Sequence, residues 1–340
     1  MQHLAFLASV ASLISAGSFV RGTPSVALDA NNNLPQGPRV VFIARTENNL
    51  HHGGSFEHRG ISNAEALNAS TMPCAKVTGD FDVYIHVKFL CSRALEFSER
   101  RGHVLDVIDE PNDKHLKDAR LHAVIFASDW DLRRRCSLPI CVAIPHHYNL
   151  PCVPSTNKTT RVGVVGTAFS RENHLALENE LSLPNETLLG ESNGKPCDFF
   201  GRLRIALAWH PTPEEADHTI GIRQREKPAE RFTNPVVLGI PTFGYRGYPS
   251  YAEYDPEGHF LCDNVKCLRE GIRKVDNGQL RSEFAALRAR VMDDVSLQAN
   301  VRRYRALIES VTALVNGQAR SNGTAPMRQW RVADPGLQLL

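Results

Sequence analysis

Residues 227–254 read KPAERFTNPVVLGIPTFGYRGYPSYAEY and predict a helix followed directly by a buried strand. Pro228 fits the first helical position, where a missing N–H has no partner to lose. We expect the helix to run from Pro228 to about Leu238, with Gly239 allowing a tight exit and a short strand over residues 242–245. The positions expected to face the core are spaced four residues apart: Phe232, Val236 and Ile240.

Polar side chains share one side of this helix. Lys227, Arg231 and Asn234 recur at spacings of four and three residues, which places them on one face. The exposed N–H groups of a helix N-terminus favour phosphate, and Arg223 and Arg225 lie just upstream. The stretch therefore predicts an anion site; the alternative is a solvated basic face without a ligand.

Residues 221–245, GIRQREKPAERFTNPVVLGIPTFGY, resemble the donor-binding helix of GT-B glycosyltransferases of families 1 and 4. Many relatives carry a Glu, seven residues and a second Glu before an apolar helix that ends in Gly-x-Pro. This chain has Glu226, seven residues and then Asn234, which can hydrogen-bond a ribose hydroxyl without a carboxylate's charge. The resemblance implies that Asn234 or Glu226 contacts the ribose of a nucleotide-sugar donor, and that three cations bind its diphosphate: Arg223, Lys227 and Arg231.

Two residues of the segment depart from an ideal phosphate-binding helix. Glu230 places a negative charge in the first turn, and Pro235 is expected to kink the helix. The strand RVGVVGT is expected to turn on Gly166, and the resemblance implies that the loop at this position faces the donor, which makes Gly166 and Thr167 candidate donor contacts. The glycines there do not complete the dinucleotide fingerprint, so a nicotinamide enzyme is not expected.

Length and composition limit the class of protein. A chain of 340 residues with 42% hydrophobic content favours roughly two domains with sizeable cores. The formal net charge of +2 argues against a nucleic-acid partner, because nucleic-acid binding usually requires a strongly basic face. Any basic site must therefore be local.

The first residues and the cysteines indicate the secretory pathway. Residues 4–20, LAFLASVASLISAGSFV, predict a signal peptide over residues 1–22, or an uncleaved anchor that would tie the protein to a membrane. Eight cysteines suit disulfides in an oxidising compartment, with Cys136–Cys141 and Cys262–Cys267 as local pairs and no zinc spacing. Entry into a secretory lumen, or secretion, also agrees with four glycosylation sequons, at Asn68, Asn157, Asn185 and Asn322.

The order of elements predicts two α/β halves. Residues 39–152 are expected to form an N-terminal domain, with helices near 62–69, 92–101 and 129–135 and strands at 39–44, 82–89, 103–108, 122–127 and 140–144. Residues 161–317 are expected to form a C-terminal donor domain, with further strands at 161–167, 203–209 and 260–262. Its last helix, 297–315, is long enough to cross back onto the first domain, and residues 318–340 are expected to be a flexible tail. Together with the resemblance, this order implies two Rossmann-like, doubly wound domains with a cleft between them.

Polar residues at the ends of the first-domain strands are candidates for the acceptor side. In the long polar loop after the first strand, two imidazoles are directly followed by two flexible residues: His51, His52, Gly53 and Gly54. His52 is our leading candidate for the general base, because an imidazole near its ordinary pKa can take the proton of an attacking hydroxyl. Asp109, after the strand HVLDVI, is a second candidate base, with helix or turn capping as its alternative. His146, after PICVAI, is expected on the acceptor side or as a structural histidine.

Residues 128–131, Ser-Asp-Trp-Asp, allow a rival interpretation. An apolar strand followed by Asp-x-Asp resembles the cation site of metal-dependent GT-A glycosyltransferases, which would use Asp129 and Asp131. Ser128 or Asp129 is also a natural N-cap for the helix DLRRRC, and carboxylates are favoured in a first turn. We favour the cap.

The sequence therefore predicts a lumenal or secreted glycosyltransferase of GT-B type, a hexosyl- or pentosyltransferase with a nucleotide-sugar donor and a hydroxyl acceptor. No metal or cofactor is expected to be required. The alternative from another class is a non-catalytic binding protein on a decayed GT-B scaffold, since fold does not fix function.

Overall fold

The computed structural model describes residues 37–51, 56–97, 101–108, 114–148, 150, 152, 158, 160–165, 177, 180–181, 196–209, 229–317 and 328–330. By contacts between Cα atoms the chain divides into Met1–Gly37 and one compact unit, Pro38–Leu340. Apart from Gly37, every residue described below belongs to that second unit. The predicted signal peptide and the sequons at Asn157, Asn185 and Asn322 lie outside the described residues.

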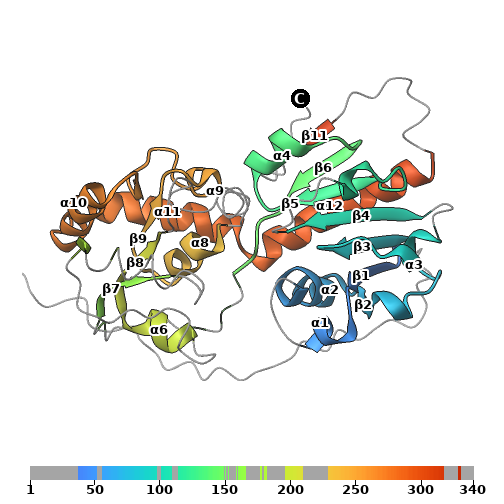
Figure 1. Ribbon diagram of the computed structural model, residues 1–340, viewed down its shortest axis with the longest axis horizontal. Helices are drawn as coiled ribbons and strands as arrows, with labels where there is room; N and C mark the ends of the chain where they lie inside the picture. Colours follow the sequence, from blue (N-terminus) through green and yellow to red (C-terminus); the bar gives the residue numbers. More distant parts are fainter. Residues whose placement is uncertain are drawn as a thin grey trace, which may run out of the picture. The chain divides into compact units, whose positions relative to one another are not determined.

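The first sheet of the described chain has seven strands in the order β11-β6-β5-β4-β3-β1-β2, all parallel (Figure 1). Its strands are β1 (Val40–Ala44), β2 (Ser70–Pro73), β3 (Val83–Val87), β4 (Gly102–Val107), β5 (Ala123–Phe126), β6 (Ile140–Ala143) and β11 (Arg328–Trp330). Because β1 lies between β2 and β3, the order reverses beside β1. Open α/β sheets bind ligands at such a reversal, outside the carboxyl ends of the strands.

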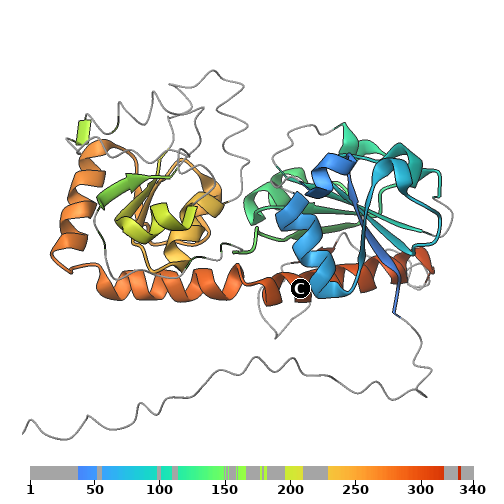
Figure 2. The same ribbon diagram turned by 90° about the horizontal axis from the view of Figure 1, so that it is seen from below.

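Strands β1, β3, β4 and β5 of this sheet are buried on both faces, as expected for near-continuous apolar runs in a parallel sheet. The helices and turns around it are α1 (Glu47–His51), the π-helix η1 (Glu57–Ile61), α2 (Ser62–Leu67), η2 (Cys74–Lys76), α3 (Ser92–Leu95), η3 (His115–Lys117), α4 (Asp129–Arg135) and α12 (Leu297–Val315). Tyr304, Leu307 and Val311 of α12 pack on the face formed by Phe42, Ile85 and their neighbours (Figure 2). The predicted return of the last helix to the first sheet is confirmed.

The second sheet has four described strands in the order β10-β9-β8-β7, again all parallel. They are β7 (Thr160–Val164), β8 (Leu203–Ala208), β9 (Thr242–Tyr245) and β10 (Leu261–Cys262), with helices α6 (Pro196–Arg202), α8 (Glu230–Val237), α9 (Pro249–Ala252), α10 (Val265–Asp276) and α11 (Arg281–Asp294). The prediction of an α/β chain with parallel sheets is confirmed. The domain boundaries at 39–152 and 161–317 and the cleft stay predictions.

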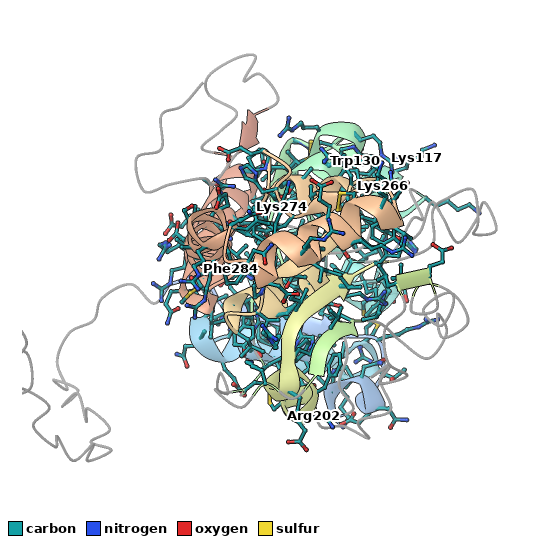
Figure 3. The ribbon with its side chains drawn as sticks, turned by 90° about the vertical axis from the view of Figure 1, so that its left-hand side faces the viewer. Lys117, Trp130, Arg202, Lys266, Lys274 and Phe284 are labelled. Atoms are coloured by element: carbon teal, nitrogen blue, oxygen red, sulfur yellow. A yellow bond between two sulfur atoms is a disulfide. The ribbon has the colours of Figure 1, made fainter. Side chains whose placement is uncertain are left out.

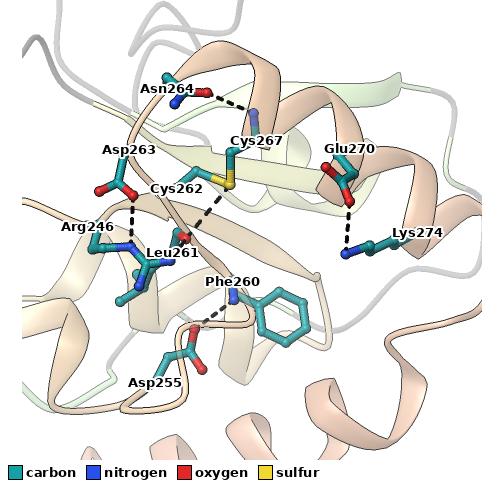
Figure 4. The surroundings of a disulfide bond; sticks show 10 residues. All are labelled: Arg246, Asp255, Phe260, Leu261, Cys262, Asp263, Asn264, Cys267, Glu270 and Lys274. Carbon is teal, nitrogen blue, oxygen red and sulfur yellow. Dashed lines mark hydrogen bonds and ion pairs between the residues drawn. A yellow bond between two sulfur atoms is a disulfide. The ribbon is translucent and has the colours of Figure 1, made fainter.

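All eight cysteines lie in the described ranges and are paired, as Cys74–Cys91, Cys136–Cys141, Cys152–Cys197 and Cys262–Cys267. The two predicted local pairs are confirmed. Figure 4 shows the Cys262–Cys267 bridge at the start of α10, where the side chain of Asn264 accepts a hydrogen bond from the Cys267 N–H at 3.0 Å. In the described ranges, no helix combines the length and the apolar character needed to cross a membrane.

Several local expectations were wrong. The stretch after β1, predicted as a long polar loop, contains α1 and η1. The helix predicted over 92–101 ends at Leu95, and β2, α6 and the strand β11 in the tail were not predicted. Helix α8 begins at Glu230, two residues later than predicted, and continues through Pro235 to Val237.

Candidate functional site

The core-facing side of α8 is built as the sequence indicates. Phe232 and Val236 are fully buried, which anchors one face of the helix in the second core. Gly239 ends the helix with φ of 76°, a left-handed conformation that glycine adopts without a Cβ clash. Arg231 and Asn234 are each half-buried on the first two turns. The anchored face therefore holds the first turn, with Glu230 and Arg231, in a fixed position.

Most other predicted site residues lie outside the described part of the chain: His52, Gly53, Gly54, Asp109, Gly166, Thr167, Arg223, Glu226 and Lys227. His51 is the last residue of α1, and its side chain is not described. Of the predicted set, the structure therefore places Arg231, Asn234 and His146, and the roles assigned to the others stay predictions.

Two histidines follow β6 and are almost completely buried. His146 is 6% exposed and His147 is 4% exposed. Nδ1 of His146 lies 2.8 Å from Oε2 of Glu230, although 84 residues separate them in the chain. The ring of His58, in η1, lies with its centroid 6.2 Å from that of His146. The segment after β6, the π-helix η1 and the first turn of α8 thus meet at one cluster, which we call the His146 cluster: His58, His146, His147, Glu230 and Arg231.

The contact with Glu230 determines which nitrogen of His146 carries a proton. A carboxylate only accepts hydrogen bonds, so Nδ1 of His146 donates. In the neutral ring, Nε2 is then the acceptor. Among the described residues, neither Nε2 of His146 nor Nδ1 of His147 has a hydrogen-bond partner. Buried polar atoms are nearly always paired, so these two nitrogens indicate a place for a polar ligand or an ordered water.

The charges of the cluster are strongly coupled. Burial alone would raise the pKa of Glu230, but the charges of His146 and His58 and the hydrogen bond from His146 outweigh it and lower that pKa to about 2. Burial, followed by the charge of His146, lowers the pKa of His58 and lowers that of His147 to about 4. Near neutral pH, Glu230 is therefore ionised, while His58 and His147 are neutral.

This arrangement suits general-base chemistry. A carboxylate that holds Nδ1–H of an imidazole fixes the ring and its tautomer and stabilises the imidazolium that forms when Nε2 takes a proton. Backbone N–H groups at the start of a helix favour an anion, and Arg231 adds a positive charge in the same turn. The cluster thus places an imidazole nitrogen that can accept a proton beside the start of a helix.

The rival site at Asp129 and Asp131 is arranged as a helix start. The hydroxyl of Ser128 accepts a hydrogen bond from the Asp131 N–H at 3.2 Å, and the Asp131 carboxylate lies 3.9 Å from Arg135. The guanidinium of Arg134 lies over the ring of Trp130, 4.3 Å from the ring centroid; Trp130 is labelled in Figure 3. The predicted capping role is confirmed. Within the described ranges, no three Asp, Glu, His or Cys side chains gather closely enough to hold a metal ion.

A hollow of about 200 Å³ lies beside the Cys262–Cys267 bridge, away from the His146 cluster. Figure 4 shows that two basic residues lining this hollow, Arg246 and Lys274, form ion pairs with acidic side chains. Arg246 pairs with Asp263 at 3.1 Å, and Lys274 pairs with Glu270 at 3.2 Å. We therefore do not assign this hollow a ligand.

Sequence reasoning missed part of the cluster. Glu230 was treated only as an unfavourable charge, and His58 was not singled out. Both lie in stretches that the sequence marked, but their role depends on His146, which comes from a distant part of the chain. The pair of histidines directly after a buried strand, His146 and His147, indicates that part of the cluster but neither Glu230 nor His58.

Known proteins resemble this chain only in overall structure. AviGT4, a glycosyltransferase involved in avilamycin A biosynthesis, matches with a TM-score of 0.47 and 11% identity, covering 81% of this chain and 98% of that one. An alpha1,3-fucosyltransferase matches with a TM-score of 0.42 and 11% identity, and the match covers 83% of this chain and 93% of that one. The T4 phage BGT in complex with its UDP-glucose substrate matches with a TM-score of 0.42 and 10% identity, and the match covers 83% of this chain and 99% of that one. At TM-scores below 0.5, these likenesses do not assign a function to this chain.

No protein-family model matches the chain, and no curated protein matches it at a significant level.

Proposed function

We propose that this protein is a glycosyltransferase that transfers a sugar, hexosyl or pentosyl, from a nucleotide-activated donor to a hydroxyl acceptor. The observation that carries the proposal is the contact of His146 with Glu230 in the first turn of α8, the helix whose sequence resembles a GT-B donor-binding helix. This contact places a candidate base next to the helix start at which, by the resemblance, the diphosphate is expected to bind.

On the donor side, the diphosphate would bind at the start of α8. Arg231 supplies a positive charge there, and the predicted contacts Arg223 and Lys227 come from the segment just before the helix. The negative charge of Glu230 is directed at His146, which lies 2.8 Å away, and this contact limits its repulsion of an anion. Asn234, one turn further along, would contact the ribose, with Glu226 as the alternative.

On the acceptor side, Nε2 of His146 would take the proton of the attacking hydroxyl. A bond forms between that oxygen and the anomeric carbon, the bond from this carbon to the phosphate oxygen breaks, and the nucleoside diphosphate leaves with the electron pair. Nε2 is shielded from solvent in the free protein, so the acceptor reaches it only as the complex forms. Neutralisation of the leaving group by Arg231 and its neighbours means that no metal ion is required, and we expect turnover to persist in a chelator.

The compartment proposed for this activity is the secretory lumen or the exterior. The four disulfides support it, because such bonds persist in oxidising environments. Asn68, the first residue of a glycosylation sequon, is exposed at the end of α2, where an N-glycan would fit. Release of a glycan from Asn68 by an N-glycosidase would test the assignment.

The test of function is turnover of nucleotide sugars by the full chain. We would measure release of nucleoside diphosphate with a panel of nucleotide sugars and hydroxyl acceptors. His146→Ala and Glu230→Gln should lower kcat by roughly 10²–10⁴, because they remove the base or its orienting carboxylate. The matched control is His259→Ala, since His259 also pairs with a Glu at 2.8 Å, but on the surface.

Full turnover in folded His146→Ala would contradict the assignment of the base and return that role to His52 or Asp109. Nucleotide binding without turnover by the unaltered chain, with any sugar, would favour the non-catalytic alternative.

A further inference from the structure

Arg59 is a charged side chain in the interior of the protein. It lies in η1, is 0% exposed, and forms two parallel hydrogen bonds with Asp106 of β4, from Nε at 3.0 Å and from Nη2 at 2.9 Å. The hydroxyl of Tyr304 in α12 donates a further hydrogen bond to Asp106 at 3.0 Å. A buried ion pair is often no more stabilising than well-packed apolar residues. The contribution of this pair to the stability of the fold therefore does not explain why an arginine is buried at position 59.

The third nitrogen of Arg59 makes the informative contacts. Nη1 donates to the backbone carbonyls of Ile144 and Pro145, the latter at 3.0 Å. Pro145 directly precedes His146. Its carbonyl also accepts a hydrogen bond from the side chain of Asn300 in α12 at 2.8 Å. Two donors from different elements therefore hold the peptide unit next to the candidate base.

The other end of the segment is held as well. The Tyr148 N–H donates to the carbonyl of Val295 at 2.9 Å. The four residues from Pro145 to Tyr148 are thus fixed at both ends, with His146 and His147 between them. The segment lies beyond the end of β6 and has no hydrogen bonds of the sheet to hold it. The contacts at its two ends therefore determine where the His146 ring lies.

The geometry of η1 serves this contact. The side chain of Asn63 donates to the carbonyls of His58 at 3.0 Å and Arg59 at 3.1 Å, which holds the wide turn. A Cβ at Gly60 would lie 2.6 Å from the ring of Phe56, so any larger residue there would displace that ring. In this turn Arg59 contacts the segment before His146, while its neighbour His58 contributes to the His146 cluster. π-helical turns occur frequently at functional sites.

We infer that Arg59 is a positioning residue for the proposed reaction: its planar fork, fixed by Asp106, holds the carbonyls before His146 so that the ring meets Glu230. The inference rests on the proposed function for its kinetic consequence, but the position of the His146 ring can be measured without turnover. Lysine cannot replace arginine in this role, because a single ammonium group does not span a carboxylate and two carbonyls in fixed directions.

The experiment compares Arg59→Lys with the unaltered full chain. We expect Arg59→Lys to fold, and to lower kcat roughly 10- to 100-fold at an unchanged donor KM, because a displacement of about 1 Å costs on this order. In NMR spectra recorded at one pH, with the imidazole signals assigned by His146→Gln, the ring signal of His146 should move toward its position in Glu230→Gln. Asn300→Ala should move it in the same direction by a smaller amount.

Tyr84→Phe is the matched control, since it removes a buried hydroxyl that donates to the Thr78 carbonyl at 2.9 Å in the same sheet. It should leave kcat and the His146 ring signal unchanged. If Arg59→Lys does not fold, Asn300→Ala provides the decisive comparison. An unchanged His146 ring signal in folded Arg59→Lys, or in folded Asn300→Ala where Arg59→Lys is unfolded, would overturn the inference. Absence of turnover in the unaltered chain would instead contradict the proposed function, while the NMR comparison would still decide the role of Arg59.

Discussion

Three histidines form a row across neighbouring strands on the face of the first sheet opposite α12. Nε2 of His86 in β3 lies 3.1 Å from Nδ1 of His103 in β4. His122, directly before β5, accepts a hydrogen bond from the His103 N–H at 3.2 Å. The ring of His103 also stacks on Tyr84, with centroids 5.1 Å apart. The row is therefore part of the packed core of that face.

Burial keeps His86 and His103 neutral. Burial, followed by the charges of His122 and Arg120, lowers the pKa of His103 from 6.5 to about 4, while Asp118 acts in the opposite direction. Burial and the charge of His103 also lower the pKa of His86 well below its ordinary value. Protonation of either ring consequently opposes folding.

These pKa shifts predict a loss of stability in mild acid. When the folded pKa is depressed, the unfolded chain binds protons first, so the contribution of His103 is complete above about pH 6.5 and is lost as pH falls toward 4. His103 alone should remove about 2 kcal/mol of unfolding free energy between pH 7.5 and pH 5. Urea unfolding of the full chain at the two pH values measures this difference.

His103→Phe should reduce that pH dependence by about the same amount, although it also lowers stability at pH 7.5 because His86 loses its partner. Exposed His259→Ala should leave the pH dependence unchanged. Equal pH dependence in His103→Phe and the unaltered chain would show that His103 does not carry the effect.

At the scale of the element, the start of α4 is held by contacts from two directions. Ser128 caps it from within, and the carboxylate of Glu253 accepts hydrogen bonds from the N–H groups of Asp129 at 3.2 Å and Trp130 at 2.8 Å. Burial raises the pKa of Glu253 to about 7, with the neighbouring charges of Asp129 and Asp294 acting in the same direction. The backbone donors of this helix start are therefore already occupied.

We predict that Ser128→Ala lowers the unfolding free energy by about 1 kcal/mol, the usual cost of removing a serine N-cap. Ser310→Ala is the matched control, because Ser310 lies inside α12 and its hydroxyl donates to the Ala306 carbonyl without capping a helix. Urea unfolding should show a change within about 0.5 kcal/mol for this control. Equal effects of the two substitutions would contradict the capping role.

Elements with strong local signals could be predicted from the sequence, and elements without them could not. The expected strand at 242–245 and helices at 129–135 and 297–315 agree residue for residue with β9, α4 and α12, because caps, glycine and apolar periodicity mark their ends. Strand β2 was missed because only Pro73 of its four residues is buried, which leaves no alternation to detect. The π-helix η1 was missed because its sequence is polar.

At the scale of the whole molecule, the candidate site depends on contacts between distant parts of the chain. Glu230 lies 84 residues from His146, and Tyr304 lies 198 residues from Asp106. Local patterns could place Arg231 and Asn234 on the first turns of α8, but they could not show that Glu230 meets an imidazole. The return of α12 to the first sheet also brings Asn300 to the segment before His146.

The central claim is that the start of α8 binds the diphosphate of a nucleotide-sugar donor, and calorimetric titration of the full chain with uridine, guanosine, adenosine and cytidine diphosphates tests it most directly. We predict that at least one of them binds, and that Arg231→Ala weakens its affinity about 10- to 100-fold, the loss expected for one charge-assisted contact. Arg273→Ala, which removes an exposed arginine of α10, should bind as the unaltered chain does. No binding of any nucleoside diphosphate, or unchanged affinity in folded Arg231→Ala, would contradict the claim.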